Sequence, residues 1–289
     1  MKILITGING QVGHALMKYL TNYELIGLTR QECDLTNPDQ IKHVIEYHQP
    51  DLIINPASYN KVDEAEDKPE LAFQVNRDAP RVMAEKSKEN NIQFIHFSTD
   101  YVFDGVKEGV YVETDKTKPL GVYGLSKLAG EELIQEAGGL AYIIRTSWVY
   151  SNIGQNFYLT MKKLCFEQDE LDVVVDQIGV PTSNYFIVEQ IKKIIPQLSK
   201  KNTGIYHLVP DGYCSWYEFA KIIISETNPN FNIKKLNAIQ TNELPTKSKR
   251  PKNSILNNAK IKQCFNLAFN NWQTEFEKIT YESHSFKNS

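Results

Sequence analysis

Short apolar runs alternate with longer amphipathic segments along the first half of the chain. Between the runs, segments starting near Val12, Pro38 and residue 70 carry apolar side chains at helical spacing. The regular alternation of strand and helix predicts a parallel sheet covered by helices on both faces. The first predicted strand, Lys2–Thr6, is mostly β-branched. The others are Glu24–Leu28, Asp51–Asn55, Ile92–Phe97 and Leu140–Arg145.

The alternation loosens after Tyr150. We expect helices over 156–168, 184–199 and 216–227, and strands over 173–175 and 204–209. The fold class is therefore α/β: a Rossmann-type doubly wound parallel sheet with a smaller C-terminal α/β substrate-binding region. We place 1–150, with part of 184–209, in the sheet domain and 151–289 mainly in the second region. A single boundary near residue 150 is a simplification, because we expect the chain to cross between the two regions more than once.

A glycine loop follows the first strand directly. Strand, glycine loop and helix together present backbone N–H groups and a helix N-terminus to a pyrophosphate. Gly7 is expected to make the tight turn, Gly10 to admit the phosphate and Gly13 to let helix and strand pack closely. The spacing is G-x-x-G-x-x-G rather than G-x-G-x-x-G. Its position at residues 7–13 nevertheless favours a dinucleotide cofactor.

The second strand ends in Leu28-Thr29-Arg30, where many dinucleotide-binding folds place an acid for the ribose 2′-hydroxyl. An arginine and a hydroxyl would instead accommodate a 2′-phosphate. We therefore expect NADPH, with NADH possible. A simple surface arginine is the competing interpretation.

The fourth strand delivers Thr99 and Asp100 to the carboxyl edge of the sheet, where ligands bind in this fold class. Downstream, Tyr123 and Lys127 are four residues apart and share a helix face. An ammonium beside a phenol should lower the tyrosine pKa and make Tyr123 a proton donor. Thr99 could hold the oxygen that receives the proton. A solvated helix face is the alternative for such a spacing taken alone.

Further candidates lie in the second half. Trp148 at a strand end is expected to cover a ligand, whereas Trp216 is expected in the core. Asn156 opens a helix and could direct donors to a diphosphate. Ser215 and Glu218 form a capping box, which needs no functional role. Arg250 is predicted to bind the substrate pyrophosphate bidentately, with Asn253 and Ser254 near the sugar or base.

Composition narrows the function classes. A net charge of −3 gives no reason to expect nucleic acid or an acidic membrane as partner. The four cysteines are widely spaced, which favours a reduced, cytoplasmic compartment and no metal site. No apolar run approaches the roughly 20 residues that span a bilayer, and no signal peptide precedes the first strand.

Several motifs together resemble the extended short-chain dehydrogenase/reductases and, within them, the dTDP-4-dehydrorhamnose reductases. The glycine loop and Tyr-x-x-x-Lys mark only the superfamily, and the other motifs are more specific. They are STDYVFDG (98–105), RTSWVY (145–150), DQIGVPT (176–182) and RPKNS (250–254).

The resemblance implies NAD(P)H-dependent reduction of a 4-keto nucleotide sugar, with Tyr123 as proton donor. Lys127 would tune Tyr123 and bind the nicotinamide ribose, and Thr99 would align the carbonyl. A dTDP-sugar would be the substrate, and the chain would be a monomer or homodimer. Residues matching the family's cofactor contacts are Gly10, Gln11, Val12, Arg30, Asp34, Leu35, Ser58, Tyr59 and Asn60; Thr99, Asp100 and Trp148 match its sugar contacts.

The sequence departs from the family at a few positions and leaves alternatives open. Pro56 and Asn60-Lys61 replace smaller residues near the nicotinamide. Ala15 replaces an acid that some members use around magnesium in a dimer, so neither the metal nor that dimer is carried over. One alternative is a reductase that delivers hydride to the other face, giving 6-deoxy-talose. Another is a non-catalytic NADP-binding regulatory subunit.

Overall fold

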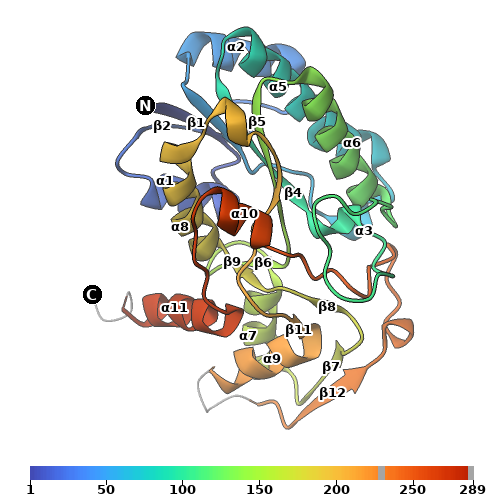
Figure 1. Ribbon diagram of the computed structural model, residues 1–289. Coiled ribbons are helices and arrows are strands. Elements are labelled where there is room, and N and C mark those ends of the chain that lie inside the picture. The colour runs from blue at the N-terminus through green and yellow to red at the C-terminus, as the bar shows by residue number, and fades with distance from the viewer. Residues whose placement is uncertain (227–231, 286–289) are drawn as a thin grey trace.

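A computed structural model describes residues 1–226 and 232–285, with the side chains described as far as residue 279. Its centre is a six-stranded sheet in the order β10-β5-β4-β3-β1-β2, in which every pairing is parallel (Figure 1). Its strands are β1 (Lys2–Thr6), β2 (Glu24–Leu28), β3 (Leu52–Asn55), β4 (Gln93–Thr99), β5 (Leu140–Thr146) and β10 (Gly204–His207). The predicted doubly wound α/β sheet is confirmed.

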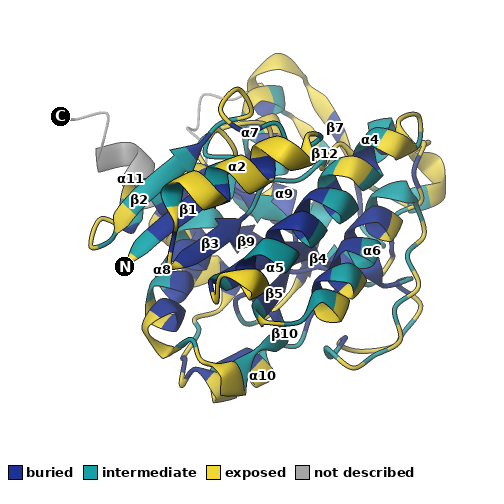
Figure 2. Ribbon diagram, turned by 90° about the horizontal axis from the view of Figure 1, so that it is seen from above, coloured by how far each residue is buried: buried dark blue, intermediate teal, exposed yellow. Residues whose placement is uncertain are grey.

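Side-chain alternation along the strands divides the interior into two cores. On β1, Ile3 and Ile5 face one core and Leu4 faces the other, and β3, β4 and β5 alternate likewise. Each core is closed by helices, and Figure 2 shows the buried strands between them. The first face is covered by α1 (Gln11–Tyr19), α8 (Asn184–Ile194) and α10 (Ala259–Cys264); the second by α2 (Pro38–His48), α5 (Ala79–Glu89) and α6 (Val122–Ala137).

The helix ends follow from local chemistry. Asn37 caps α2 by accepting hydrogen bonds from two backbone N–H groups, with Pro38 at the first helical position. The helix predicted over 184–199 ends as α8 at Ile194, followed by a 3₁₀ turn around Pro196. The helix predicted from residue 70 is divided into α4 (Pro69–Phe73), a π-helical turn (Gln74–Asp78) and α5.

A smaller lobe lies beyond the carboxyl edge of the sheet, in the lower half of Figure 1. It has its own core, in which Tyr150, Phe219 and Phe276 pack together. Its elements are β6 (Val149–Tyr150), β7 (Glu170–Val174), β8 (Ile178–Gly179), β9 (Thr182–Ser183), β11 (Cys214–Ser215), β12 (Lys235–Ile239), α7 (Phe157–Glu167), α9 (Trp216–Ser225) and α11 (Trp272–Ser285). The predicted end of α9 at 227 lies outside the described residues.

Short elements complete the fold. They are α3 (Val62–Ala65) and the 3₁₀ turns Asp100–Val102, Lys200–Asn202 and Thr241–Glu243. None of the helices within the described ranges combines the length and apolarity needed to span a membrane.

Candidate active site

A cavity of about 690 Å³ opens at the carboxyl ends of β1, β3, β4 and β5 and extends to the smaller lobe. It brings together residues that are far apart in the sequence, as expected at this edge of a doubly wound sheet. The predicted site residues that line it are Gly7, Gly10, Gln11, Val12, Gly13, Ser58, Asn60, Thr99, Asp100, Tyr123, Lys127, Trp148, Asn156 and Arg250.

A second cavity of about 190 Å³ adjoins the first and shares Gly7, Ala57 and Ser58 with it. The predicted cofactor residues Arg30, Asp34, Leu35, Ser58 and Tyr59 line this cavity. The two cavities form a continuous surface with the glycine loop at their junction, which suits an extended dinucleotide.

The glycine loop has the geometry that its sequence predicts. Gly7 has a φ of +60°, and a Cβ at Gly13 would lie only 2.3 Å from the Gly7 carbonyl oxygen, so no larger residue fits at residue 13. Gly10 precedes α1 without a capping side chain. The first-turn amides of α1 therefore remain available to an anion in the cavity.

The candidate catalytic residues converge from β4 and α6. Thr99 is the last residue of β4. Its hydroxyl donates to Asp100 Oδ1 at 3.0 Å and accepts from the Tyr101 amide. Tyr123 and Lys127 occupy successive turns of α6, and the Lys127 Nζ donates to the Phe97 carbonyl at 2.6 Å. A hydroxyl, a phenol and an amine thus line one wall of the cavity.

The expected lowering of the Tyr123 pKa is wrong for this structure. Loss of water around the phenol raises its pKa to about 12, outweighing a hydrogen bond with Thr99 that lowers it. Lys127, only 1% exposed, has its own pKa lowered by burial to about 7, with the Glu131 charge opposing the change. Sequence spacing indicated proximity, but it could not show that burial dominates both groups.

Asp100 is a buried acid beside the wall formed by Thr99, Tyr123 and Lys127. Burial raises the pKa of its carboxyl to about 6, against hydrogen bonds from Ser254 and Thr99 that lower it. Its Oδ2 atom has no hydrogen-bond partner among the described residues. Asp100 therefore offers a free acceptor at the base of the cavity.

Asn156 is in the predicted place, but its side chain is already engaged. Its oxygen accepts from the Leu159 amide and caps α7, while its nitrogen donates to Gln11 Oε1 at 2.8 Å and to the Ser151 and Ile153 carbonyls. Ser151 also donates to Gln11. This network ties the glycine loop to the smaller lobe.

Trp148 and Trp216 form a stacked pair where the main cavity meets the smaller lobe, with ring centroids 3.5 Å apart and planes within 7°. Trp148 has a φ of +45° and lies against Gly179, where an added Cβ would come within 2.4 Å of its ring. Trp216 packs on the lobe core and also lines the cavity. Its prediction as core alone missed this second position, which depends on stacking that the sequence does not encode locally.

Arg250 reaches the cavity from a loop and pairs with Asp63 of α3 at 3.1 Å. Its Nε is buried without a partner among the described residues. Sequence reasoning missed Asp63, which lies almost two hundred positions from Arg250. Asn253 lines neither cavity, because its amide nitrogen donates to the Lys107 and Gly109 carbonyls and its oxygen accepts from the Ile255 amide.

The end of β2 is less free of acids than the sequence indicated. Glu32 accepts hydrogen bonds from the Thr29 amide and hydroxyl at 2.7 and 2.8 Å, which lower its pKa. Arg30 is largely exposed and lies 3.8 Å from Asp34. Arg30 and the Asp34 carboxylate thus line the second cavity together.

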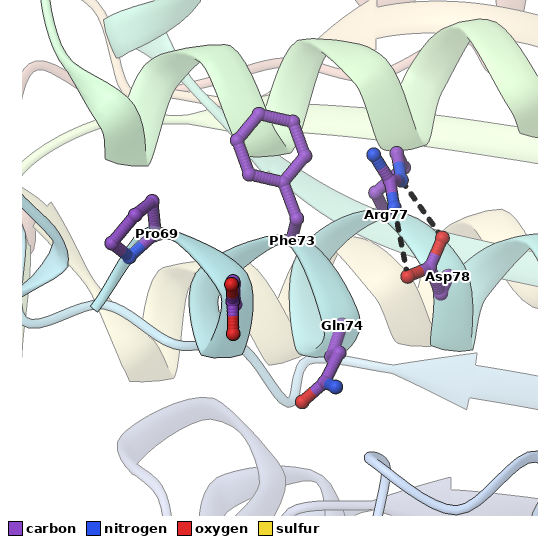
Figure 3. A pocket seen from close by; sticks show the side chains of 6 residues that line it. Pro69, Phe73, Gln74, Arg77 and Asp78 are labelled. Carbon is purple, nitrogen blue, oxygen red and sulfur yellow. Dashed lines mark hydrogen bonds and ion pairs between the residues drawn. The ribbon is translucent and has the colours of Figure 1, made fainter.

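A third cavity, of about 380 Å³, shares no residue with the first two. Figure 3 shows that Arg77 and Asp78, which line it, are joined by two hydrogen bonds. Arg77 also stacks over Phe73, 4.9 Å from its ring centroid.

Across the part of the chain that the structure describes, no three His, Cys, Asp or Glu residues group as a metal site.

Comparison with known proteins shows extensive sequence similarity. The family model "RmlD substrate binding domain" matches residues 1–284. The chain is 40% identical over 287 residues to the dTDP-4-dehydrorhamnose reductase of Aggregatibacter actinomycetemcomitans, covering 96% of this chain and 98% of that one. It is 38% identical over 292 residues to the Escherichia coli K12 reductase, with 98% of both chains covered.

Solved structures agree with the sequence comparison. The dTDP-4-dehydrorhamnose reductase of Bacillus anthracis, in complex with NADP, matches with a TM-score of 0.91 and 35% identity, over 97% of this chain and 99% of that one. The Clostridium acetobutylicum orthologue matches with a TM-score of 0.92 and 34% identity, over 98% and 100% of the chains. The chain therefore belongs to the RmlD substrate binding domain family and, within it, to the dTDP-4-dehydrorhamnose reductases, a family of oxidoreductases.

Proposed function

We propose that the chain reduces the 4-keto group of dTDP-4-dehydro-β-L-rhamnose with NADPH and forms dTDP-L-rhamnose. The observation that carries this proposal is the convergence of Thr99, Tyr123 and Lys127 on one wall of a cavity that the glycine loop also lines. A catalytic wall beside a dinucleotide loop is the arrangement that such a reduction requires. The names of the relatives supply the substrate class.

The residues present fit a dinucleotide. The open first turn of α1 at Gly10 would bind the pyrophosphate, and Gly13 permits the close packing that this loop needs. We assign the cofactor to Gly7, Gly10, Gln11, Val12, Gly13, Arg30, Asp34, Leu35, Ser58, Tyr59, Asn60, Tyr123 and Lys127. NADPH is the preferred form, supported by the NADP complex of the Bacillus anthracis relative and by Arg30, and NADH is the alternative.

When bound, the nicotinamide supplies the hydride that is added to sugar C4. Thr99 turns its hydroxyl proton from Asp100 to the carbonyl oxygen, holds that oxygen and stabilises the charge that develops on it. Tyr123 then donates its phenolic proton to that oxygen, which completes the hydroxyl and leaves a phenolate. The Lys127 ammonium stabilises the phenolate, and so offsets the cost of ionising a phenol with a raised pKa.

The smaller lobe would hold the rest of the substrate. Arg250 contributes a buried, unpartnered Nε for the diphosphate, and the Trp148–Trp216 pair offers an aromatic surface. Asp100 provides an acceptor for a sugar hydroxyl. We assign the nucleotide sugar mainly to 151–289 and the cofactor to 1–150 with part of 184–209. A role for Asn253 would require its amide to leave the backbone partners described above.

The partners and compartment follow from the same proposal. The substrate is a dTDP-sugar, and the chain acts as a monomer or homodimer. All four cysteines are free thiols, which favours the cytoplasm, where thiols stay reduced.

The test is NADPH oxidation, followed by absorbance, with dTDP-4-keto-L-rhamnose generated in situ and the product sugar identified. We expect turnover that yields dTDP-L-rhamnose. A 6-deoxy-talose product would overturn the assigned hydride face. Tight NADPH binding without turnover would instead favour another keto-sugar or a regulatory subunit.

A further inference from the structure

Four buried polar side chains form a continuous hydrogen-bonded row beneath the catalytic wall. Thr6 Oγ1 lies 2.6 Å from Asn55 Oδ1, Asn55 Nδ2 lies 3.1 Å from His96 Nδ1, and His96 Nε2 lies 3.0 Å from Lys127 Nζ. The exposed fraction of each residue is 2% or less. The row therefore ends on the amine that the proposed reaction needs as a cation.

The row is a product of strand register. Thr6, Asn55 and His96 come from β1, β3 and β4, and Asn55 and His96 are direct partners in the sheet. All three side chains point to the face covered by α6, which supplies Lys127. Burying a polar group is costly unless it is hydrogen-bonded. Three buried polar side chains that are hydrogen-bonded in line therefore indicate a shared role.

The proton positions along the row are linked. An ammonium on Lys127 donates to His96, so His96 Nε2 must carry a lone pair and its proton must sit on Nδ1. Asn55 must then turn its amide oxygen toward His96 and its nitrogen toward Thr6, whose hydroxyl can accept. In the structure Asn55 has the other orientation, with Nδ2 toward His96 Nδ1 and Oδ1 accepting from the Thr6 hydroxyl, which suits a neutral Lys127. A half-turn of the amide exchanges the two arrangements without moving the row.

We infer that His96 is a positioning residue that holds Lys127 as an ammonium by accepting at Nε2, with the Asn55 amide turned so that its oxygen accepts from Nδ1–H. The inference rests on the proposed function, because it gives Lys127 its role in that reaction. Two acceptors, Phe97 O and His96 Nε2, take two of the three N–H groups. One N–H remains for the cavity.

Charge and burial around the pair support this role. Burial lowers the pKa of Lys127 to about 7, and burial together with Lys127 keeps the His96 pKa well below its usual value, so the imidazole stays neutral. Glu131 raises the Lys127 pKa from the same helix, but its carboxylate is already paired with Arg145 of β5 and accepts from Ser98. The neutral acceptor that contacts Lys127 Nζ, His96 Nε2, therefore remains to stabilise the ammonium.

The first experiment needs no substrate. In ¹⁵N-histidine-labelled protein, with the His96 signals assigned by their loss in His96→Gln, we expect the Nδ1–H tautomer at neutral pH. In Lys127→Met the donor is gone, and His96 should move to the Nε2–H tautomer that is commoner in water. An Nε2–H tautomer in the unchanged protein, or no response to Lys127→Met, would overturn the inference whatever the enzyme reduces.

The second experiment uses a matched pair of substitutions. His96→Phe keeps the ring but removes the acceptor, so the pH above which kcat/KM declines should shift down by about one to two units. His96→Gln returns an acceptor and should restore most of that shift. A merely structural role predicts an equal loss at all pH values in His96→Phe, measured per folded molecule by circular dichroism, and that result would also reject the inference.

Discussion

The two ends of the main cavity are built in different ways. At the proposed catalytic end, Thr99, Tyr123 and Lys127 come from one strand–helix unit, β4 and α6. At the proposed sugar end, Trp148, Trp216 and Arg250 come from three segments far apart along the chain. The first end is fixed by backbone and buried hydrogen bonds, the second by one ring stack and one ion pair.

This difference leads us to expect that one end of the cavity sets the rate of the reaction and the other sets the affinity for the nucleotide sugar. Groups held within about 0.5 Å by buried partners can serve a reaction whose geometry is strict. Half-exposed groups on several segments can adjust to a large ligand, and they contribute mainly to affinity. Substitutions at the catalytic end should therefore reduce kcat, whereas those at the sugar end should raise KM.

The largest expected effect tests the catalytic end. Tyr123→Phe removes the proton donor and should lower kcat by about 10²–10⁴-fold, with NADPH affinity unchanged. Steady-state rates and fluorescence titration of NADPH check both values. Tyr101→Phe is the matched control, because its ring contacts Tyr123 edge-on at 5.6 Å in the same cavity and is given no proton to transfer. Near-normal turnover in Tyr123→Phe would exclude the assigned donor.

The next effect tests the sugar end. Arg250→Ala should raise the KM for the nucleotide sugar by about 10- to 100-fold, the worth of a hydrogen bond to a charged group, with a much smaller change in kcat. Lys252→Ala is the control, because Lys252 is a cation in the same loop, pairs with Asp176 and does not line the cavity. Equal losses in kcat and KM would contradict the separation of the two ends.

The pH dependence should distinguish the ends without any substitution. Because burial lowers the Lys127 pKa to about 7, the ammonium is present below that pH and lost above it. We expect kcat/KM for reduction to fall by about tenfold per pH unit above about 7, measured with NADPH at saturation. A rate that rises with pH in that range would mean that Lys127 is not needed as a cation.

A smaller effect is expected at the second cavity. Arg30→Ala should weaken NADPH by several-fold and leave NADH little changed, because a largely exposed ion pair is worth about 1 kcal/mol or less. Dissociation constants for the two cofactors give the ratio directly. Arg81→Ala, an exposed arginine of α5 outside both cavities, serves as the control. Equal weakening of both cofactors would show that Arg30 does not recognise the 2′-phosphate.

The catalytic end was also the more predictable from sequence. The apolar run before Thr99 and the four-residue spacing of Tyr123 and Lys127 place these three residues, because each position depends only on its own strand or helix. The Trp148–Trp216 stack and the Arg250–Asp63 pair depend on tertiary packing, for which no local pattern exists. The raised Tyr123 pKa was missed for the same reason, since it reports burial rather than spacing.

The smallest effect links local capping to the sugar end. Ser215 accepts from the Glu218 amide and Glu218 returns a bond to Ser215, which fixes the first turn of α9. Trp216 is the first residue of that helix and lines the cavity. Ser215→Ala should cost about 1 kcal/mol of unfolding free energy and raise the sugar KM slightly through a less fixed Trp216. Urea denaturation and steady-state kinetics measure the two effects. Asn37→Ala, which removes the side-chain cap of α2 outside the cavity, should change stability alone.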